Sequence, residues 1–491
     1  MAAKHRREFL RKSLCALAGS ASFTSVMGKV QLSAGASQKM LKGAGDNYRA
    51  MVCLDLSGGN DCFNTIVPTD TGNYGTYAAT RSNLAVPQNQ LLQLTGVDYG
   101  LHPEMSGTQE MFNRGMAAVV GNVGPLVRPV DKQLYEQPGT PLPPQLFSHS
   151  DQSVLWQSPR ADAQVRRGWG GRLADIFAAS NANPVLSMNV SMDGENVFQA
   201  GDLVSPYFMS TDGVEDISTI QTGAANCEDG GQGWNRRRCL SFNALRDMNH
   251  DHPFERAYAG LLRGTMATSA QVREAIALYP ENAAVFRPFW ERNGLSWNPD
   301  NLAELPSLAQ QLLMIARVIQ ARGDLQMSRQ LFYARIGSFD THGSQLADHP
   351  PLLADLSASV AAFYDVLEDP AFALSNDVTA FTVSEFGRTL TINGDGTDHG
   401  WGGHHLVFGG AVNGGQIYGT MPNLDASESN PDNAGWGQII PTLSVDQYAA
   451  TLASWYGLST EDRNTIFPNL QFMSGNLLSV SGPDLGFMQP G

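Results

Sequence analysis

Residues 378–405 read VTAFTVSEFGRTLTINGDGTDHGWGGHH, an apolar run that ends at Glu385 and leads into a glycine-rich loop. Such a run is typical of a strand covered on both faces, as in a parallel sheet. An acid at the end of so apolar a strand is costly unless it is paired or binds a metal ion. This stretch therefore indicates both the fold class and a region of function.

Two earlier stretches repeat this pattern. RAMVCLDL at residues 49–56 runs into a turn that holds Asp61, and LFYARI at residues 331–336 runs into Asp340 and His342. Parallel strands bring their carboxyl ends to one edge of a sheet, where open α/β folds bind ligands. We expect these acids and imidazoles to gather at that edge.

Helical periodicity between the strands supports an α/β fold. Residues 308–322, 351–368 and 445–456 carry apolar side chains at helical spacing. The alternation of strands and helices predicts right-handed crossovers and a mostly parallel sheet. We predict one large α/β domain over residues 45–491, with an irregular, partly helical insertion at about 200–305.

The glycine-rich loop offers Asp398, His399 and His404 as candidate metal ligands. Glycine lets a backbone fold tightly around an ion or a substrate. His405 alternates with His404 along the next strand, so we expect one of the two to face the site and favour His404. The alternative is a surface loop whose histidines have other partners.

Two further pairs carry oxygen or nitrogen ligands. Asp340 and His342 lie two residues apart, so both point to one side of an extended segment. Their side chains suit Zn, Mn or a similar divalent ion, although Asp340 could instead cap a helix. Glu385 is either a metal ligand, with Arg388 as an anion clamp, or half of a buried Glu385–Arg388 ion pair.

Three other sites are more ambiguous. Asp61 is a candidate ligand in its turn, with Asn60 or Asp55 as alternatives. Ser148 starts a helical stretch, where a serine can act as a nucleophile beside a metal or simply cap the helix. Residues 250–252 read HDH and could bind a metal, but they lie in the irregular insertion.

The charge balance argues against nucleic acid as a partner. The 491 residues carry a formal net charge of −15, and without the first 36 residues the net charge is −20. Phosphate backbones need clustered positive charge. An anionic substrate would need local positive charge or a metal ion. Beyond the amino-terminal segment no apolar run approaches about 20 residues, so we predict no stable membrane insertion.

The first 36 residues have the form of an export signal. HRREFLRK at residues 5–12 is close to a twin-arginine motif, and a small-residue AGA pattern at 34–36 follows an apolar run. We predict recognition by the twin-arginine translocase and a periplasmic or extracellular destination; the alternative is a basic tail. In an oxidising compartment Cys227 and Cys239 could form a disulfide.

Several motifs occur in order along nearly the whole chain. They are the export signal, LDLSGGNDCFNTIVP (54–68), GLHPEM (100–105), SHSDQSVLWQS (148–158), GSFDTHGSQ (337–345) and VSEFGRTLTINGDGTDHGWGGHH (383–405). Together they resemble the exported family catalogued as domain of unknown function 1501. The resemblance implies an alkaline-phosphatase-like or sulfatase-like fold, which is a three-layer α/β/α sandwich. It also implies one or two divalent metals and a Ser, Thr or Cys nucleophile at the strand ends.

The resemblance is partial at the ligand positions. Asp340 and His342 match the superfamily's Asp–His pair loosely, and His399 or His404 matches a later histidine. Where the superfamily has an Asp–His at the next strand end, this chain has Ser384-Glu385. No cysteine stands in a C-x-P-x-R sequence, which disfavours a formylglycine sulfatase.

The sequence therefore predicts an exported metal-dependent hydrolase or transferase that acts on a phosphate or sulfate ester, carried by a small molecule or a polymer. A divalent ion (Zn, Mn, Ca or Mg) would polarise the ester, Ser148 would attack, and Arg388 would stabilise the developing charge. The alternative is a non-catalytic exported binding or structural protein that keeps the fold.

Overall fold

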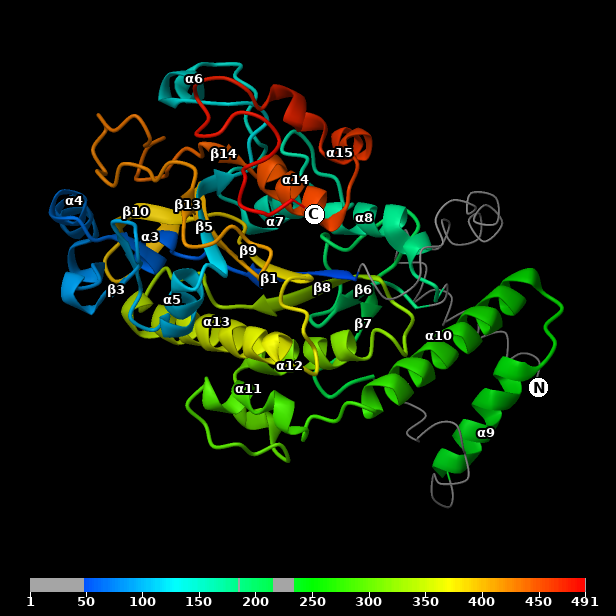
Figure 1. The fold of residues 1–491 in the computed structure, drawn as a ribbon. Coiled ribbons are helices and arrows are strands. Elements are labelled where there is room, and N and C mark those ends of the chain that lie inside the picture. Colours follow the sequence, from blue (N-terminus) through cyan, green and yellow to red (C-terminus); the bar gives the residue numbers. More distant parts are fainter. Residues whose placement is uncertain (1–47, 184–185, 215–233, 491) are drawn as a thin grey trace.

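A computed structural model describes residues 48–183, 186–214 and 234–490, so the predicted export signal and Cys227 lie outside the described residues. A nine-stranded sheet forms the centre of this part of the chain (Figure 1), with the order β13-β5-β12-β9-β1-β8-β6-β7 and β14 beside β5. Its strands are β1 (Arg49–Leu56), β5 (Ala117–Gly124), β6 (Asn189–Ser191), β7 (Tyr207–Phe208), β8 (Arg329–Ile336), β9 (Val378–Val383), β12 (Gly403–Phe408), β13 (Ile417–Tyr418) and β14 (Leu443–Ser444).

The central strand β1 shows why the sheet has two buried faces. Ala50, Val52 and Leu54 belong to one apolar core, whereas Met51 and Cys53 belong to another. Successive side chains of a strand point to opposite faces, so an unbroken apolar run supplies both cores. The apolar stretch at residues 49–56 is thereby confirmed as a central strand.

Helices cover both faces, which gives the predicted three layers (Figure 1). One core includes side chains of α5, α12 and α13, and the other includes side chains of α7, α8, α14 and α15. The bounds are α5 (Ser106–Asn113), α7 (His149–Gln157), α8 (Trp169–Phe177), α12 (Ser307–Gln320), α13 (Gln345–Glu368), α14 (Val445–Tyr456) and α15 (Thr460–Ile466).

The sheet is parallel except at β12. β1 pairs in parallel with β8 and β9, so the ends of these three strands meet at one edge as predicted. β12 runs antiparallel to both β5 and β9. The loop before β12 therefore arrives at the same edge from the opposite direction, and it carries His399 there.

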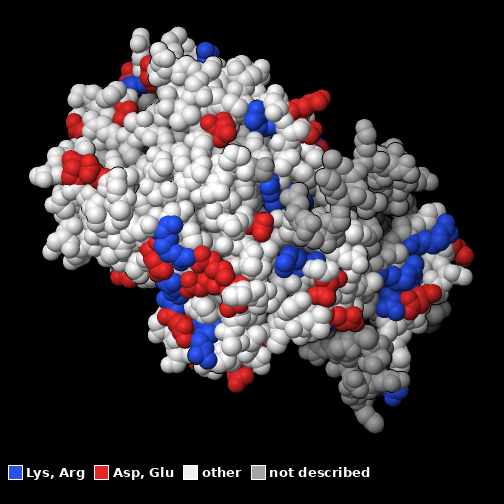
Figure 2. Space-filling model, viewed as in Figure 1, with Lys and Arg blue, Asp and Glu red and all other residues white. Residues whose placement is uncertain are grey.

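The remaining elements are short or lie outside the sandwich. Within the predicted insertion, α9 (Trp234–Asp247) and α10 (Pro253–Ala277) form a pair of helices that extends away from the sheet (Figure 1). Acidic and basic side chains are interspersed on the face of the molecule that Figure 2 shows. No helix among the described residues is long and apolar enough to cross a membrane. The elements not yet given are α3 (Cys62–Thr65), β2 (Ile66–Pro68), α4 (Thr71–Arg81), β3 (Leu92–Gln93), β4 (Tyr99–Leu101), α6 (Lys132–Glu136), α11 (Pro288–Glu291), β10 (Arg388–Ile392) and β11 (Thr397–His399).

Candidate metal centre

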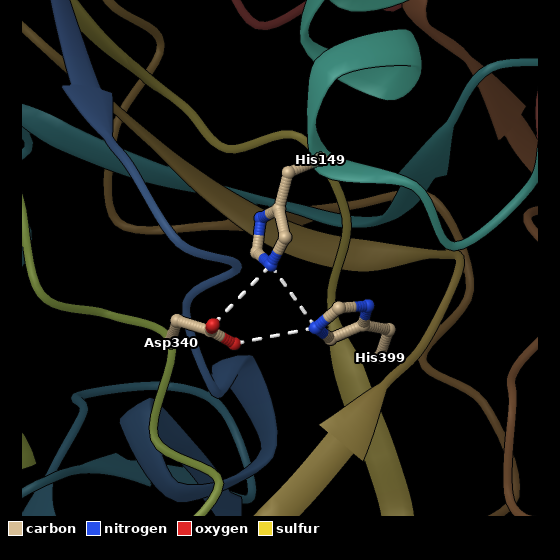
Figure 3. Close-up of side chains that lie close together, drawn as sticks. All are labelled: His149, Asp340 and His399. Carbon is tan, nitrogen blue, oxygen red and sulfur yellow. Dashed lines mark hydrogen bonds and ion pairs between the residues drawn. The ribbon is translucent and has the colours of Figure 1, made fainter.

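Three segments at the carboxyl edge of the sheet bring His149, Asp340 and His399 together (Figure 3). His149 is the first residue of α7, Asp340 follows β8, and His399 ends the short strand β11. One ligand atom from each residue lies within 4.8 Å of the other two. The cluster thus joins segments that are about 190 and 60 residues apart along the sequence.

The distances fit a shared cation. His149 Nε2 lies 3.0 Å from His399 Nε2 and 3.4 Å from Asp340 Oδ2. His399 Nε2 lies 3.3 Å from Asp340 Oδ1. Ligands that are each roughly 2.0 Å from a tetrahedral ion stand roughly 3.3 Å apart. The two nitrogens and the carboxylate therefore already have the spacing of ligands around one ion.

The outer nitrogen of each imidazole has its own acceptor. His399 Nδ1 donates to the backbone carbonyl of Phe147 at 2.7 Å, because a carbonyl can only accept. His149 Nδ1 lies 2.9 Å from Glu385 Oε1, and an ionised carboxylate likewise only accepts. With Nδ1 protonated, the Nε2 atom of a neutral imidazole carries a lone pair. Both lone pairs are then free to bind a cation, as in carboxylate–histidine–metal arrangements.

His342 adds a third imidazole to the cluster. Its Nε2 lies 2.8 Å from His399 Nε2 and 3.1 Å from Asp340 Oδ1. Its Nδ1 lies 3.1 Å from Asp398 Oδ1, so this ring repeats the arrangement of the other two. His342 is a candidate fourth ligand, and Asp398 is its outer partner. The predicted pairing of Asp340 with His342 on one side of an extended segment agrees with these distances.

Buried groups hold Asp340 and Glu385 in place. The Arg388 guanidinium is wholly buried and donates to Asp340 Oδ1 at 2.7 Å. Glu385 Oε1 accepts from the backbone N–H of Gly58 at 2.8 Å, and Oε2 accepts from that of Gly59 at 3.3 Å. Gly58 has φ +121°, and a Cβ there would overlap the backbone nitrogen of Asp340. The turn after β1 must therefore be glycine for the two strand ends to approach.

Hydrogen bonds, burial and neighbouring charges shift the pKa values of the cluster residues in different directions. The hydrogen bond to Glu385 raises the pKa of His149, although partial burial opposes it. Partial burial lowers the pKa of His399, and the charge of His149 lowers it further. Partial burial acts to raise the pKa of Asp340, but the hydrogen bond and charge of Arg388 outweigh this and hold it below its usual value. Asp340 is thereby kept ionised, as a metal ligand must be.

A cavity of about 500 Å³ opens beside the cluster. Its walls include His149, Asp340 and Glu385. The ring of Phe386 stacks on His399 with centroids 4.6 Å apart and also contacts His149. The cluster therefore has one apolar side and one side open to a ligand.

The family "Protein of unknown function (DUF1501)" matches residues 48–433, most of the chain. This chain belongs to the DUF1501 family. No protein of curated function matches it. A crystal structure of a mutant of alkaline phosphatase PafA aligns with TM-score 0.26 and 11% identity, over 70% of this chain and 64% of that chain. The alignment thus spans less than two thirds of that structure, and a similarity this low carries no argument about function.

In this DUF1501 protein, two predicted ligands lie away from the cluster. Asp61 is wholly buried, caps α3, and forms an ion pair with Arg81. His404 is also buried, and its Nδ1 accepts from the backbone N–H of Asn122 at 3.0 Å. Burial lowers the pKa of His404 to about 3, so this imidazole is a neutral core side chain. The structure does not bring either residue to the cluster of His149, Asp340 and His399.

The predicted catalytic residues also take other positions. Ser148 occupies the N-cap of α7, and its hydroxyl donates to Asp151 Oδ2 at 2.6 Å. Ser148 does not line the cavity beside the cluster. Arg388 faces Asp340 and the carbonyls of Gly58 and Thr397 rather than the cavity. Glu385 contacts His149 rather than Arg388, so the alternative of a Glu385–Arg388 ion pair is not what the structure contains.

The sequence reasoning missed His149. It stands between the two serines of SHSD, of which Ser148 is the predicted nucleophile. The available signal was a histidine at the start of a helix, preceded by a loop long enough to reach the sheet edge. Its partners are 236 and 250 residues away along the chain, which no local pattern can reveal.

Proposed function

We propose that this protein is a divalent-metal-dependent hydrolase or transferase, similar in chemistry to the alkaline phosphatase superfamily, that acts on a phosphate or sulfate ester. One observation carries the proposal: imidazoles with engaged Nδ1 atoms turn their Nε2 atoms toward one point beside an ionised carboxylate. Such a set of nitrogen and oxygen ligands suits Zn or Mn, and Mg or Ca less well.

The residues of this chain have distinct parts in the proposal. His149, His399 and Asp340 hold the ion, with His342 as a fourth ligand. A bound divalent ion would supply positive charge to polarise the ester oxygen. Arg388 keeps Asp340 ionised and oriented, and Glu385 orients the ring of His149 by accepting from its Nδ1. The cavity beside the cluster receives the ester.

Elemental analysis of the purified protein tests the metal centre. We expect close to one Zn or Mn per chain, and a loss of that metal in His149→Ala and His399→Ala. His252→Ala is the matched control: His252 is exposed, and the structure places it at the N-cap of α10, where its Nδ1 accepts from the backbone N–H of Phe254, outside the cluster. A wild-type protein that retains no divalent metal and keeps its thermal stability after chelation would overturn the proposal.

Turnover is tested separately with aryl-phosphate and aryl-sulfate substrates on the metal-loaded protein. Activity that depends on His149 and survives in His252→Ala supports a hydrolase. Ser148→Ala then tests the predicted nucleophile: a fall of about a hundredfold or more would assign Ser148 the attack, and unchanged activity would remove it.

The second candidate is a non-catalytic exported protein that keeps the metal centre for binding or stability. It is favoured by the position of Ser148, whose hydroxyl is engaged by Asp151 outside the cavity. Stoichiometric metal with no turnover of either ester class would select this candidate.

We also propose that the protein is exported by the twin-arginine translocase to the periplasm or beyond, with residues 45–491 as one domain. The support is the HRREFLRK motif and the cleavage pattern at 34–36. Replacing Arg6 and Arg7 by lysine should retain the protein in the cytoplasm. Unchanged export of that variant would refute the twin-arginine route.

A further inference from the structure

The cavity beside the metal centre has an unusual lining. Four serines, Ser57, Ser150, Ser153 and Ser338, surround it together with Gly58, His149, Asp340 and Glu385. Arg335 completes the lining, and it carries the permanent positive charge among these residues. Hydroxyls and a guanidinium are donors, and a wall of donors fits a ligand rich in acceptors.

Arg335 reaches the cavity because of its register in the sheet. It precedes the last residue of β8 and stands opposite Asp55 of β1. Tyr333 and Leu331, two and four residues earlier on the same strand, belong to the apolar core on one face. Along this face the strand therefore passes from the apolar Leu331 and Tyr333 to the charged Arg335 near its carboxyl end, where the cavity lies.

Two contacts hold the guanidinium without filling its donor capacity. Arg335 Nη2 donates to Ser57 Oγ at 2.8 Å, and Nη1 donates to Asp193 Oδ2 at 3.1 Å. The side chain stays 45% exposed. A guanidinium has five N–H groups, so Arg335 can keep both contacts and still donate to a ligand.

We propose that Arg335 is the residue that recognises the negatively charged oxygens of the ester in this cavity. This inference rests on the proposed function, since it names the group that selects the substrate of the same site. The remaining ligand oxygens would accept from the serine hydroxyls of the lining, while the metal centre engages the ester from the other side.

The surrounding negative charges favour a cationic residue in this cavity. Asp340 and Glu385 line the same cavity, Asp193 contacts Arg335, and the chain as a whole carries a net charge of −15. An oxyanion entering this field meets repulsion unless a cation receives it. Arg388 cannot serve, because its side chain is 0% exposed and bound to protein oxygens.

Arg335→Gln and Asp193→Asn form the decisive pair, because both break the same ion pair. If Arg335 only stabilises the fold through Asp193, both variants should behave alike. If Arg335 binds the anion, Arg335→Gln should raise the Kd for inorganic phosphate or sulfate about tenfold, and Asp193→Asn should lower it, since a competing carboxylate is gone. The Kd of Arg335→Lys should lie between those of wild type and Arg335→Gln, because lysine keeps the charge but not the two-pronged geometry of arginine.

Isothermal titration calorimetry of the zinc-loaded protein with inorganic phosphate, and separately with sulfate, measures these constants. Arg167→Gln is the matched control: Arg167 also pairs with an aspartate, Asp202, and its side chain is 57% exposed. Equal Kd values for wild type and Arg335→Gln, or parallel changes in Arg335→Gln and Asp193→Asn, would overturn the inference.

Metal content, measured on the same samples, separates this inference from the proposed function. If the protein holds zinc but binds phosphate independently of Arg335, only the role of Arg335 is refuted and the metal-dependent function still stands. Protein that holds no zinc but still binds phosphate through Arg335 refutes the metal-dependent function and leaves the anion site standing.

Discussion

Replacing Glu385 by glutamine should weaken metal binding, although Glu385 need not touch the ion. Three donors converge on its carboxylate: the N–H groups of Gly58 and Gly59, and Nδ1 of His149. A glutamine has one acceptor oxygen and adds an NH2 donor, so at least one of the three donors loses its acceptor. Glu385 is 4% exposed, so water cannot easily replace the lost bond. A buried unpaired donor costs about 1–3 kcal/mol, and outer partners of metal-binding histidines are worth about 10- to 100-fold in affinity.

The size of this effect should depend on pH, and the sign follows from His149. The hydrogen bond that His149 donates to Glu385 raises the pKa of His149, so Glu385→Gln lowers it. A metal must displace any proton on the ring, and this competition is stronger in wild type at low pH. In the glutamine variant the pKa of His149 is lower, so protons compete less with the metal for the ring at low pH. The loss of affinity should therefore be greatest near pH 8 and smaller near pH 6.

A competition titration of zinc against a chromophoric chelator at pH 6 and pH 8 measures both effects. Asp355→Asn is the control. Asp355 is a largely buried carboxylate on α13 that accepts from Ser359 Oγ at 2.8 Å, and its hydrogen-bond partners do not belong to the cluster. It should leave the zinc Kd unchanged. A folded Glu385→Gln protein with the wild-type zinc Kd at pH 8 would refute the argument that Glu385 orients His149.

Three other changes separate structural roles from metal binding. Arg81→Gln leaves the carboxylate of Asp61 buried without its cation, so it should lower the free energy of unfolding by about 3–5 kcal/mol. Its zinc content should stay at the wild-type value. Loss of zinc in the folded variant would show that Asp61 does contribute to metal binding. Gly58→Ala should cost about 1–3 kcal/mol from its positive φ alone and should also reduce zinc binding, whereas Gly337→Ala, which has open space around it, should do neither; equal zinc affinity in both variants would contradict the close approach. Asp446 is wholly buried with no hydrogen-bond partner for either side-chain oxygen, and burial raises its pKa well above the usual value. Its protonated form persists in the folded state, so folding grows less favourable as the pH rises above the unfolded pKa; Asp446→Asn should be increasingly more stable than wild type from pH 4.5 to pH 7.5 in urea unfolding, and a difference that does not change with pH would refute this.

The sheet and its functional edge were predictable because their signals are local. The apolar runs at residues 49–56 and 378–383 announce buried strands, and parallel strands must end at one edge. Asp340, His342 and His399 follow directly from that rule, since each lies within a few residues of a strand end.

The rest of the site depends on partners that are distant along the chain. Asp61 ends a strand as well as Asp340 does, but Arg81, from a helix that begins later, neutralises it in the core. The glycine-rich loop points His399 outward, while His404, in β12, turns into the core beside Phe63. Such choices are made by tertiary packing, and spacing alone does not encode them.

The antiparallel direction of β12 has a consequence for the order in which the protein matures. His399 reaches the cluster only when the chain has turned back and β12 has inserted between β5 and β9, two strands that are more than 250 residues apart in sequence. Closing so long a loop is slow and comes late in folding. An ion that binds at this edge would therefore stabilise the sheet after it has formed rather than nucleate its folding. A protein that retains the ion would be one in which β1 and β12 have both joined the sheet.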